Sequence, residues 1–223
     1  MPTFTDLYYS SPTSIGNSSL QPEKAIAYES GLKYQLEGIV GHLAYFHRSG
    51  KNMIDWIKKP NENIWYAQNI TELNTDGIEF SARINPQKLI DRKMFIKSIS
   101  LSWSWLTQDK QSGIYSSKYV LDFLNHKIDL GLSHTIIKNV GINWQISYQD
   151  RNGSYTNWEG SKYGNEVEYK PFVLVDSRLH LTKNNTNIYL EASNLFDKAY
   201  YDFGNIEQPG RSFRIGFIHQ FNL

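Results

Sequence analysis

The sequence predicts an all-β, antiparallel fold, because hydrophobic and polar residues alternate along nearly the whole chain in long segments joined by alternately short and long links. Such alternation places successive side chains on opposite faces of a strand. It is clearest over residues 95–105, where Ile99, Leu101 and Trp103 share one face and serines 98, 100, 102 and 104 the other. A helix would scatter those serines around its circumference, so this segment is predicted to be a strand.

Nine strands are expected. Hydrophobic and polar residues alternate poorly in the second of them, which is assigned as a strand mainly because the neighbouring strands require one. The nine strands cover residues 24–36, 39–48, 75–86, 94–106, 126–137, 139–149, 172–182, 186–196 and 211–221. Strands of soluble proteins average about 5 to 6 residues, whereas tilted transmembrane strands have about 9 to 11. The lengths therefore predict an antiparallel transmembrane β-barrel segment.

The links between these strands alternate in length. Short links are expected at residues 37–38, 86–92, 138–139 and 183–186, and long loops at 49–73, 107–125, 150–171 and 197–210. Short turns at one end and long loops at the other are typical of outer-membrane barrels. Aromatic residues near strand ends, among them Tyr34, Trp105 and Tyr148, suit the girdles at the membrane interfaces.

Composition narrows the class of protein. The net charge of +1 gives no electrostatic case for nucleic acid or an acidic substrate, and the absence of cysteine excludes disulfides and thiolate metal sites. No run of 18 apolar residues exists, so no transmembrane helix is expected. Transmembrane barrel strands are not excluded, because their hydrophobic and polar residues alternate and give a low mean hydropathy. Residues 1–11 do not resemble a signal peptide, so either the chain is a mature or truncated product or the protein is not exported.

Two other architectures remain open at this point. A soluble β-sandwich also alternates, because one face of each sheet packs on a core, and it could bind carbohydrate through Trp56, Trp65 and Trp158. It would be soluble without detergent. A small, complete outer-membrane barrel with a structural or adhesive role is the other alternative. An even strand number and a signal peptide would favour it.

The C-terminal stretch contains the motif Asn194–Lys198 followed by Tyr200 and Tyr201, then the triplet Pro209–Arg211 and a last strand that ends in an aromatic residue. It closely resembles the end of TonB-dependent outer-membrane receptors, in which an NLFD-K-Y motif closes the penultimate strand, a loop containing PGR follows, and an aromatic-ended strand finishes the protein. Residues 2–9, 16–34 and 150–155 resemble the same family, so the resemblance covers nearly the whole chain.

This resemblance implies that residues 1–223 are the C-terminal part of a receptor barrel domain, about nine strands of a 22-stranded barrel with the plug domain absent. It implies a location in the cell outer membrane and active uptake of a scarce nutrient, an iron-siderophore complex or cobalamin. The implied partners are outer-membrane lipid, the barrel-assembly machinery and, in the full-length receptor, TonB and a small-molecule ligand. We expect that this chain alone does not transport.

The resemblance also assigns an assembly signal to the last strand. Arg214, Gly216, His219 and Phe221 follow the spacing of the β-signal that the barrel-assembly machinery recognises. His219 stands where an aromatic is usual, and Asn222 and Leu223 extend past the usual terminal Phe.

Ligand contacts in this family come from extracellular loops and the plug, so aromatic residues on predicted loops are the ligand-binding candidates. They are Trp56, Trp65, Trp158, Tyr200 and Tyr201. Such rings suit stacking against a large ring or sugar surface, but they could equally cap loops or join the girdle. Lys33, Arg83 and Arg178 are expected to face the lumen.

No enzyme, metal site or cofactor is expected. The six histidines form no HExxH pair and fit solvated or girdle positions better than ligand positions. No GxSxG motif and no Gly-rich phosphate loop is present.

Overall fold

The computed structural model describes residues 1–223 except 61, 91, 111–114, 118–122, 203 and 222–223. Its contacts divide the chain into two units. Unit 1 comprises Met1–Ser30, Ala44–Ile78 and Leu106–Leu124, and unit 2 comprises Gly31–Leu43, Glu79–Trp105 and Asn125–Leu223. Among the described residues no helix has the length and apolar character needed to cross a membrane.

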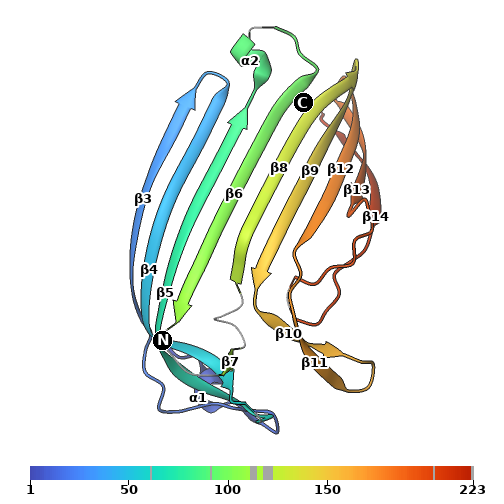
Figure 1. The fold of residues 1–223 in the computed structure, drawn as a ribbon. Coiled ribbons are helices and arrows are strands. Elements are labelled where there is room, and N and C mark those ends of the chain that lie inside the picture. Colours follow the sequence, from blue (N-terminus) through green and yellow to red (C-terminus); the bar gives the residue numbers. More distant parts are fainter. Residues whose placement is uncertain (61, 91, 111–114, 118–122, 203, 222–223) are drawn as a thin grey trace. The chain divides into compact units, whose positions relative to one another are not determined.

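Unit 2 contains segments of nine long strands, paired in the order in which they follow along the chain (Figure 1). The strands are β3 Lys24–Leu36, β4 Ile39–Lys58, β5 Trp65–Ile84, β6 Ile96–Lys110, β8 Phe123–Ile137, β9 Val140–Asn152, β12 Phe172–Lys183, β13 Thr186–Ser193 and β14 Ser212–His219. The predicted all-β class is confirmed.

The short links of unit 2 are confirmed, and their residues explain the turns. Gly38, Asn139 and Asn184 have φ of 82°, 67° and 50°, a left-handed conformation that glycine and asparagine tolerate best. The link between β5 and β6 contains the short helix α2, Pro86–Ile90. These turns reverse the chain at one end of consecutive strands.

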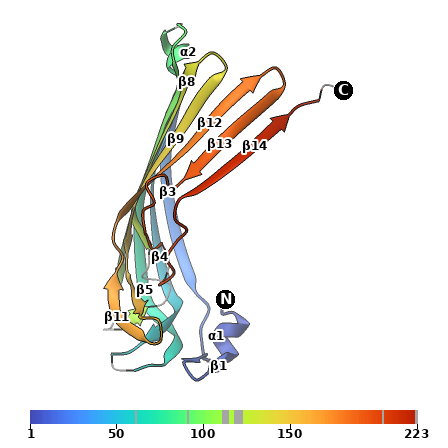
Figure 2. The same cartoon turned by 90° about the vertical axis from the view of Figure 1, so that its right-hand side faces the viewer.

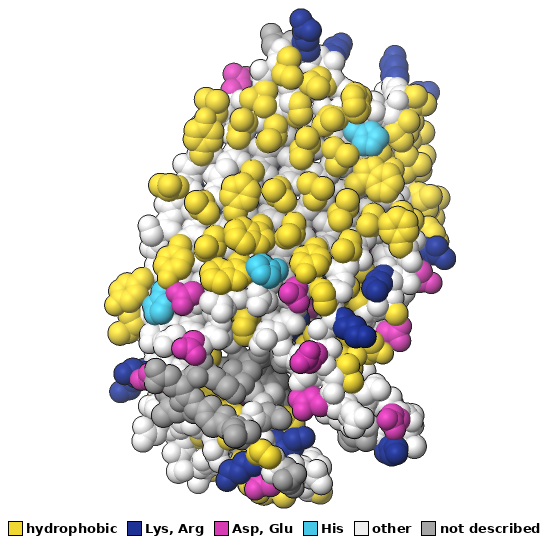
Figure 3. All heavy atoms as spheres, viewed as in Figure 1, with side chains coloured by type: hydrophobic (Ala, Val, Ile, Leu, Met, Phe, Trp, Pro, Cys, Tyr) yellow, Lys and Arg dark blue, Asp and Glu magenta, His cyan; other side chains and the backbone are white. Residues whose placement is uncertain are grey.

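The strand register separates an apolar face from a polar one. Leu190 on β13 lies opposite Leu179 on β12 and Ile215 on β14. Ile215 remains 78% exposed, and the apolar side chains form a broad surface on the sheet of unit 2 (Figure 3). A β-sandwich would bury this face under a second sheet, and none covers it in the described residues of unit 2. The soluble-sandwich alternative therefore does not match the fold.

Unit 1 holds the N-terminal elements and the remaining parts of β3, β4, β5, β6 and β8. Its short elements are α1 Phe4–Tyr8, β1 Ser10–Ser11, β2 Ser14–Ile15 and β7 Ser116–Ser117. β2 pairs in parallel with β5, and β7 pairs antiparallel with β4. Two small cores stabilise the unit: Met53, Ile57, Ile70 and Leu73 in one, and Leu20, Trp56 and Ala67 in the other.

Two predicted long loops were placed wrongly. Residues 49–73 are largely strand, because β4 continues to Lys58 and β5 begins at Trp65. The left-handed residue Asn52, with φ of 54°, lies within the continuing strand β4. Likewise β6 extends to Lys110 and β8 begins at Phe123, so only part of 107–125 connects them, and most of that part lies outside the described residues.

The predicted loop 150–171 contains a hairpin of its own. β10, Ser154–Trp158, pairs antiparallel with β11, Tyr163–Glu168, as a separate two-stranded sheet (Figure 2). This hairpin and the link between β13 and β14 hold the candidate site of unit 2.

Candidate functional site

Two of the five predicted ligand-binding residues, Tyr200 and Tyr201, join one aromatic cluster in unit 2. The ring of Tyr201 stacks on that of Tyr155 with a centroid separation of 4.9 Å, and the ring of Tyr200 lies 4.6 Å from that of Phe172. Tyr155 comes from β10 and Phe172 from the start of β12. The cluster thus joins the link between β9 and β12 to the link between β13 and β14.

A charged pair links the same two segments. Nη2 of Arg151 lies 3.0 Å from Oδ1 of Asp202, and the guanidinium lies 5.9 Å from the ring centre of Tyr169. The Tyr169 hydroxyl in turn accepts a hydrogen bond of 2.8 Å from the amide of Gly204. The Arg151 side chain is 16% exposed and that of Asp202 is 44% exposed, so only the arginine partner is shielded from solvent.

Burial raises the pKa of two phenols of the cluster. Desolvation raises the pKa of Tyr155, and the charge of Tyr201 adds to the effect. Desolvation also raises the pKa of Tyr200, with further contributions from Asp202 and Asp176. At neutral pH these hydroxyls are therefore uncharged donors and acceptors of hydrogen bonds.

A pocket of about 210 Å³ opens beside the cluster. Its lining includes Tyr155, Phe172, Tyr200 and Tyr201 together with charged residues of both segments: Glu168, Lys170 and Lys198. Trp158, the third candidate in unit 2, does not line this pocket and is 48% exposed at the end of β10. Sequence reasoning missed Tyr155, Phe172 and Lys170, since only the fold brings them beside Tyr200. Lys198 was named as a motif residue but not as a ligand-binding candidate.

The NLFDK motif has a structural role next to this site. Asn194 is buried, with a φ of 48°. Its amide nitrogen Nδ2 donates to the carbonyl of Lys198 at 2.9 Å and to that of Pro209 at 3.4 Å, while its Oδ1 accepts from the Lys198 amide at 2.8 Å. One side chain therefore ties both ends of the link between β13 and β14.

Asp197 also holds the link between β13 and β14 by a hydrogen bond. Its Oδ1 accepts a hydrogen bond of 2.7 Å from the backbone amide of Arg211. A Cβ on Gly210 would lie 2.7 Å from the same oxygen, which explains the glycine in the PGR triplet. The motif residues on which the resemblance rests thus hold the backbone that presents Tyr200 and Tyr201.

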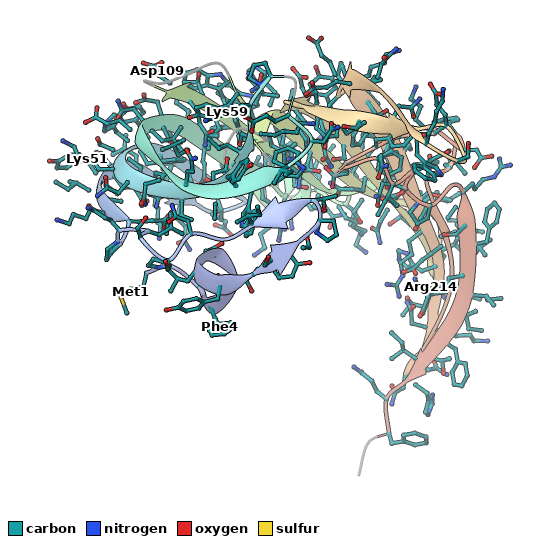
Figure 4. All side chains as sticks on the ribbon, turned by 90° about the horizontal axis from the view of Figure 1, so that it is seen from below. Met1, Phe4, Lys51, Lys59, Asp109 and Arg214 are labelled. Atoms are coloured by element: carbon teal, nitrogen blue, oxygen red, sulfur yellow. The ribbon has the colours of Figure 1, made fainter. Side chains whose placement is uncertain are left out.

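Unit 1 holds the other two candidates, and Trp56 is a core residue there. Its ring is 7% exposed and packs with Leu20 and Ala67, and its indole nitrogen donates to Oδ1 of Asp6 at 3.0 Å. Trp65 packs against the same core, with Nζ of Lys58 at 5.1 Å from its ring centre. The ring of Trp56 is therefore unavailable for ligand stacking. Figure 4 labels Phe4 on α1, which carries Asp6.

Asp6 should make the stability of unit 1 sensitive to acid. Burial raises the pKa of its carboxyl, but hydrogen bonds from the Thr3 hydroxyl and amide and from the Trp56 indole lower it more, to below its ordinary 3.8. This contribution to stability is fully present above pH 3.8 and is lost as pH falls through the folded-state pKa. We expect the Asp6→Asn variant to lack this acid-induced loss of stability when unfolding is measured as a function of pH. The exposed Glu62→Gln variant is the control and should behave like the unchanged protein. If Asp6→Asn and the unchanged protein are equally sensitive to acid, Asp6 is not the source of the acid sensitivity.

The four predicted assembly-signal residues lie on or just beyond β14, where Figure 4 labels Arg214. Nη1 of Arg214 lies 3.4 Å from Oε2 of Glu191, and Nη1 of Arg178 lies 3.3 Å from the other oxygen of that carboxylate. The ring of His219 lies 4.6 Å from that of Phe221. These contacts place Arg178 and Arg214 on the same face of β12 to β14 and do not test recognition by the assembly machinery.

Gly216 has a packing reason of its own. A Cβ at this position would come within 2.5 Å of the ring end of Tyr189, which lies opposite it on β13. That ring also stacks under the guanidinium of Arg178, whose Cζ is 3.9 Å from its centre. A side chain on Gly216 would push the ring away from this position.

We expect Gly216→Ala to destabilise unit 2, and to do so less when Tyr189 is also replaced by alanine, with a coupling energy of about 1 kcal/mol. Denaturant unfolding of the two single variants and the double variant measures this coupling. If the glycine acts only as an assembly signal, the coupling will be absent and Gly216→Ala will slow barrel assembly equally in both backgrounds.

No group of three or more potential metal-ligating side chains was found among the described residues. The face opposite the apolar one instead carries charged pairs and hydroxyl groups. Ser81, Ser100, Ser102 and Arg83 line one of its hollows together with Asp129. The site that this chain offers is thus an aromatic and basic pocket beside a polar sheet face.

Comparison with solved structures shows the same fold in much longer chains. The chain matches the copper transporter OprC with a TM-score of 0.71 and 13% identity, over 97% of this chain and 35% of that one. It matches the siderophore receptor PirA from Pseudomonas aeruginosa with a TM-score of 0.61 and 18% identity, over 97% and 34%. For the ferric-catecholate import receptor Fiu from E. coli the TM-score is 0.65 and the identity 17%, over 93% and 29%. The chain therefore spans about a third of the length of these structures.

The match to a family model covers most of the chain and is independent of the final strand. Residues 1–195 match the model described as TonB dependent receptor-like, beta-barrel. The match ends at the start of the NLFD motif, so the resemblance of the last 28 residues adds to it rather than repeating it. The chain therefore belongs to the TonB-dependent receptor family, within its β-barrel domain.

Proposed function

We propose that this chain forms part of the barrel wall of an outer-membrane receptor that takes up an iron-siderophore complex. The observation that carries the proposal is the large exposed apolar face of unit 2, backed by a polar face and flanked by a loop pocket. An apolar face of this size is stable only in an apolar surrounding such as lipid. The chain's role is binding and passage of a ligand and not an enzymatic step.

The spacing of two histidines supports a lipid-facing band. On β8 the ring of His126 stacks on Trp103, and that of His134 lies edge-on to Phe95. The two histidines are eight residue steps apart, which span about 26 Å of strand, or about 20 Å along the membrane normal at a tilt of about 40°. That separation is close to the apolar band of about 25 Å found between the aromatic girdles of outer-membrane barrels.

Transport requires more than these residues. Among the described strands β3 pairs only with β4 and β14 only with β13, and unpaired strand edges are costly in lipid. We therefore propose that the chain acts within a longer receptor, which supplies the remaining strands and a plug. TonB and the barrel-assembly machinery are the proposed partners of that receptor. The iron, siderophore and copper transport named for the matched structures supports a metal-complex cargo, and cobalamin is the other ligand to test.

Deleting the receptor gene and measuring growth tests this function. We expect the deletion strain to grow poorly when one ferric siderophore is the only iron source, and growth to return with the intact gene. The receptor should be found in the outer-membrane fraction. Normal growth on every ferric siderophore supplied, with a defect only on cobalamin, would move the proposal to that ligand. A receptor found in the soluble fraction would overturn it.

A further inference from the structure

We propose that the pocket between the link from β9 to β12 and the link from β13 to β14 binds a single aromatic ring that carries an acidic group. This inference rests on the proposed function in one respect, that the protein binds a small-molecule ligand. The choice of ligand comes from this pocket alone. Its walls are the Tyr155–Tyr201 stack and the Phe172–Tyr200 pair. Flat apolar walls favour a planar ring over a branched or polar ligand.

The size of the pocket limits the ligand to one ring. Its volume of about 210 Å³ lies below the range of about 300 to 1,000 Å³ that accommodates drug-sized molecules. A complete multi-ring ligand would not fit. The pocket suits one arm of a larger ligand, or a small free acid.

Two lysines in the pocket lining can pair with an anion. Lys170 and Lys198 line the pocket together with Glu168. Asp202 and Asp176 also act on Tyr200 there, but Asp202 is already paired with Arg151. Neither lysine is within ion-pair distance of a carboxylate in the described part of the chain. A carboxylate or phenolate on the bound ring would therefore gain charge-assisted contacts that no protein group already uses.

The arrangement is held in place before any ligand binds. The Arg151–Asp202 pair and the Asn194 and Asp197 hydrogen bonds fix the two segments that supply the walls. The Tyr200 hydroxyl is a neutral group that can donate a hydrogen bond. Fixed walls reduce the ordering cost of binding.

Binding of salicylate to the full chain refolded in detergent micelles tests the inference. We expect salicylate to bind and benzyl alcohol, a ring without the charge, to bind at least about tenfold more weakly. The double variant Lys170→Met/Lys198→Met should lose about tenfold in affinity, and added salt should weaken binding of the unchanged protein. Lys183→Met, at the last residue of β12, is the matched control and should bind like the unchanged protein.

Three results would overturn the inference: no salicylate binding, equal affinity in the double lysine variant, or glucuronate binding as tightly as salicylate. The last would indicate an acidic sugar site. Tyr200→Leu removes one wall without touching the charges and should weaken salicylate binding as well. If salicylate binds as expected but the gene deletion leaves growth unaffected, the uptake function fails while the pocket assignment stands. If the gene deletion stops growth as expected but salicylate does not bind, the pocket assignment fails while the uptake function stands.

Discussion

Replacing Trp56 by alanine is expected to destabilise unit 1 by about 3 to 5 kcal/mol, the cost typical of truncating a buried Trp. The ring is 7% exposed and packs with Leu20 and Ala67, which come from different segments of the unit. Its loss would leave a cavity and free the Asp6 carboxylate of one hydrogen bond. Residues 1–30 should then separate from β4 and β5 more easily.

Trp158→Ala is the matched control, because it makes the same truncation at a ring that is 48% exposed. Surface substitutions of this kind stay within about 0.5 kcal/mol. Denaturant unfolding followed by circular dichroism measures both variants, and limited proteolysis reports the release of residues 1–30. If Trp56→Ala leaves unfolding unchanged but abolishes ligand binding, Trp56 is a ligand contact after all and its assignment to the core is wrong.

The strands of unit 2 could be predicted because each signal is local. Alternation over residues 95–105 gives the two faces of β6 directly, and the same pattern gives β8, β9 and β12 to β14. Their turns contain Gly38, Asn139 and Asn184, the residue types that accept a positive φ. The alternating pattern lies within each strand and the turn residues lie directly beside it, so both can be recognised from a short stretch of sequence.

Unit 1 could not be predicted in this way, since its contacts are not local. Trp56 appeared to be a loop residue because the Ser-Gly-Lys-Asn stretch before it is typical of a turn. Its core partners come from residue 20 and residue 67. The side chain of Asn69 bonds backbone groups of Gln21 and Asn52, which alternation along one strand does not indicate.

The site of unit 2 was predicted in part. The motif named Tyr200 and Tyr201, but their partners Tyr155 and Phe172 lie 45 and 28 residues earlier than Tyr200. Arg151 could have been suspected, since an arginine in a predicted loop often pairs with an acid elsewhere. Its partner Asp202 could not be identified before the two links were known to meet.

Asn194→Ala is expected to destabilise unit 2 by about 2 to 4 kcal/mol. The substitution leaves the Lys198 amide and the carbonyls of Lys198 and Pro209 without their partner. These groups are only partly buried and can bond water instead, so the three losses together cost about 1 to 2 kcal/mol. It also places alanine at a φ of 48°, which costs about 1 to 2 kcal/mol for a residue with a Cβ.

Two further variants separate these contributions. Asn194→Gly keeps the left-handed backbone and loses only the hydrogen bonds, so it should be less damaging than Asn194→Ala. Asn139→Ala introduces the same strain, at a φ of 67°, at an exposed turn position, and should cost only the conformational part, about 1 kcal/mol. Denaturant unfolding compares all three, and salicylate affinity reports whether the pocket walls have moved. If Asn194→Ala and Asn139→Ala cost the same, the side-chain bonds of Asn194 contribute nothing. The residues of the NLFDK motif would then not serve to stabilise the link between β13 and β14.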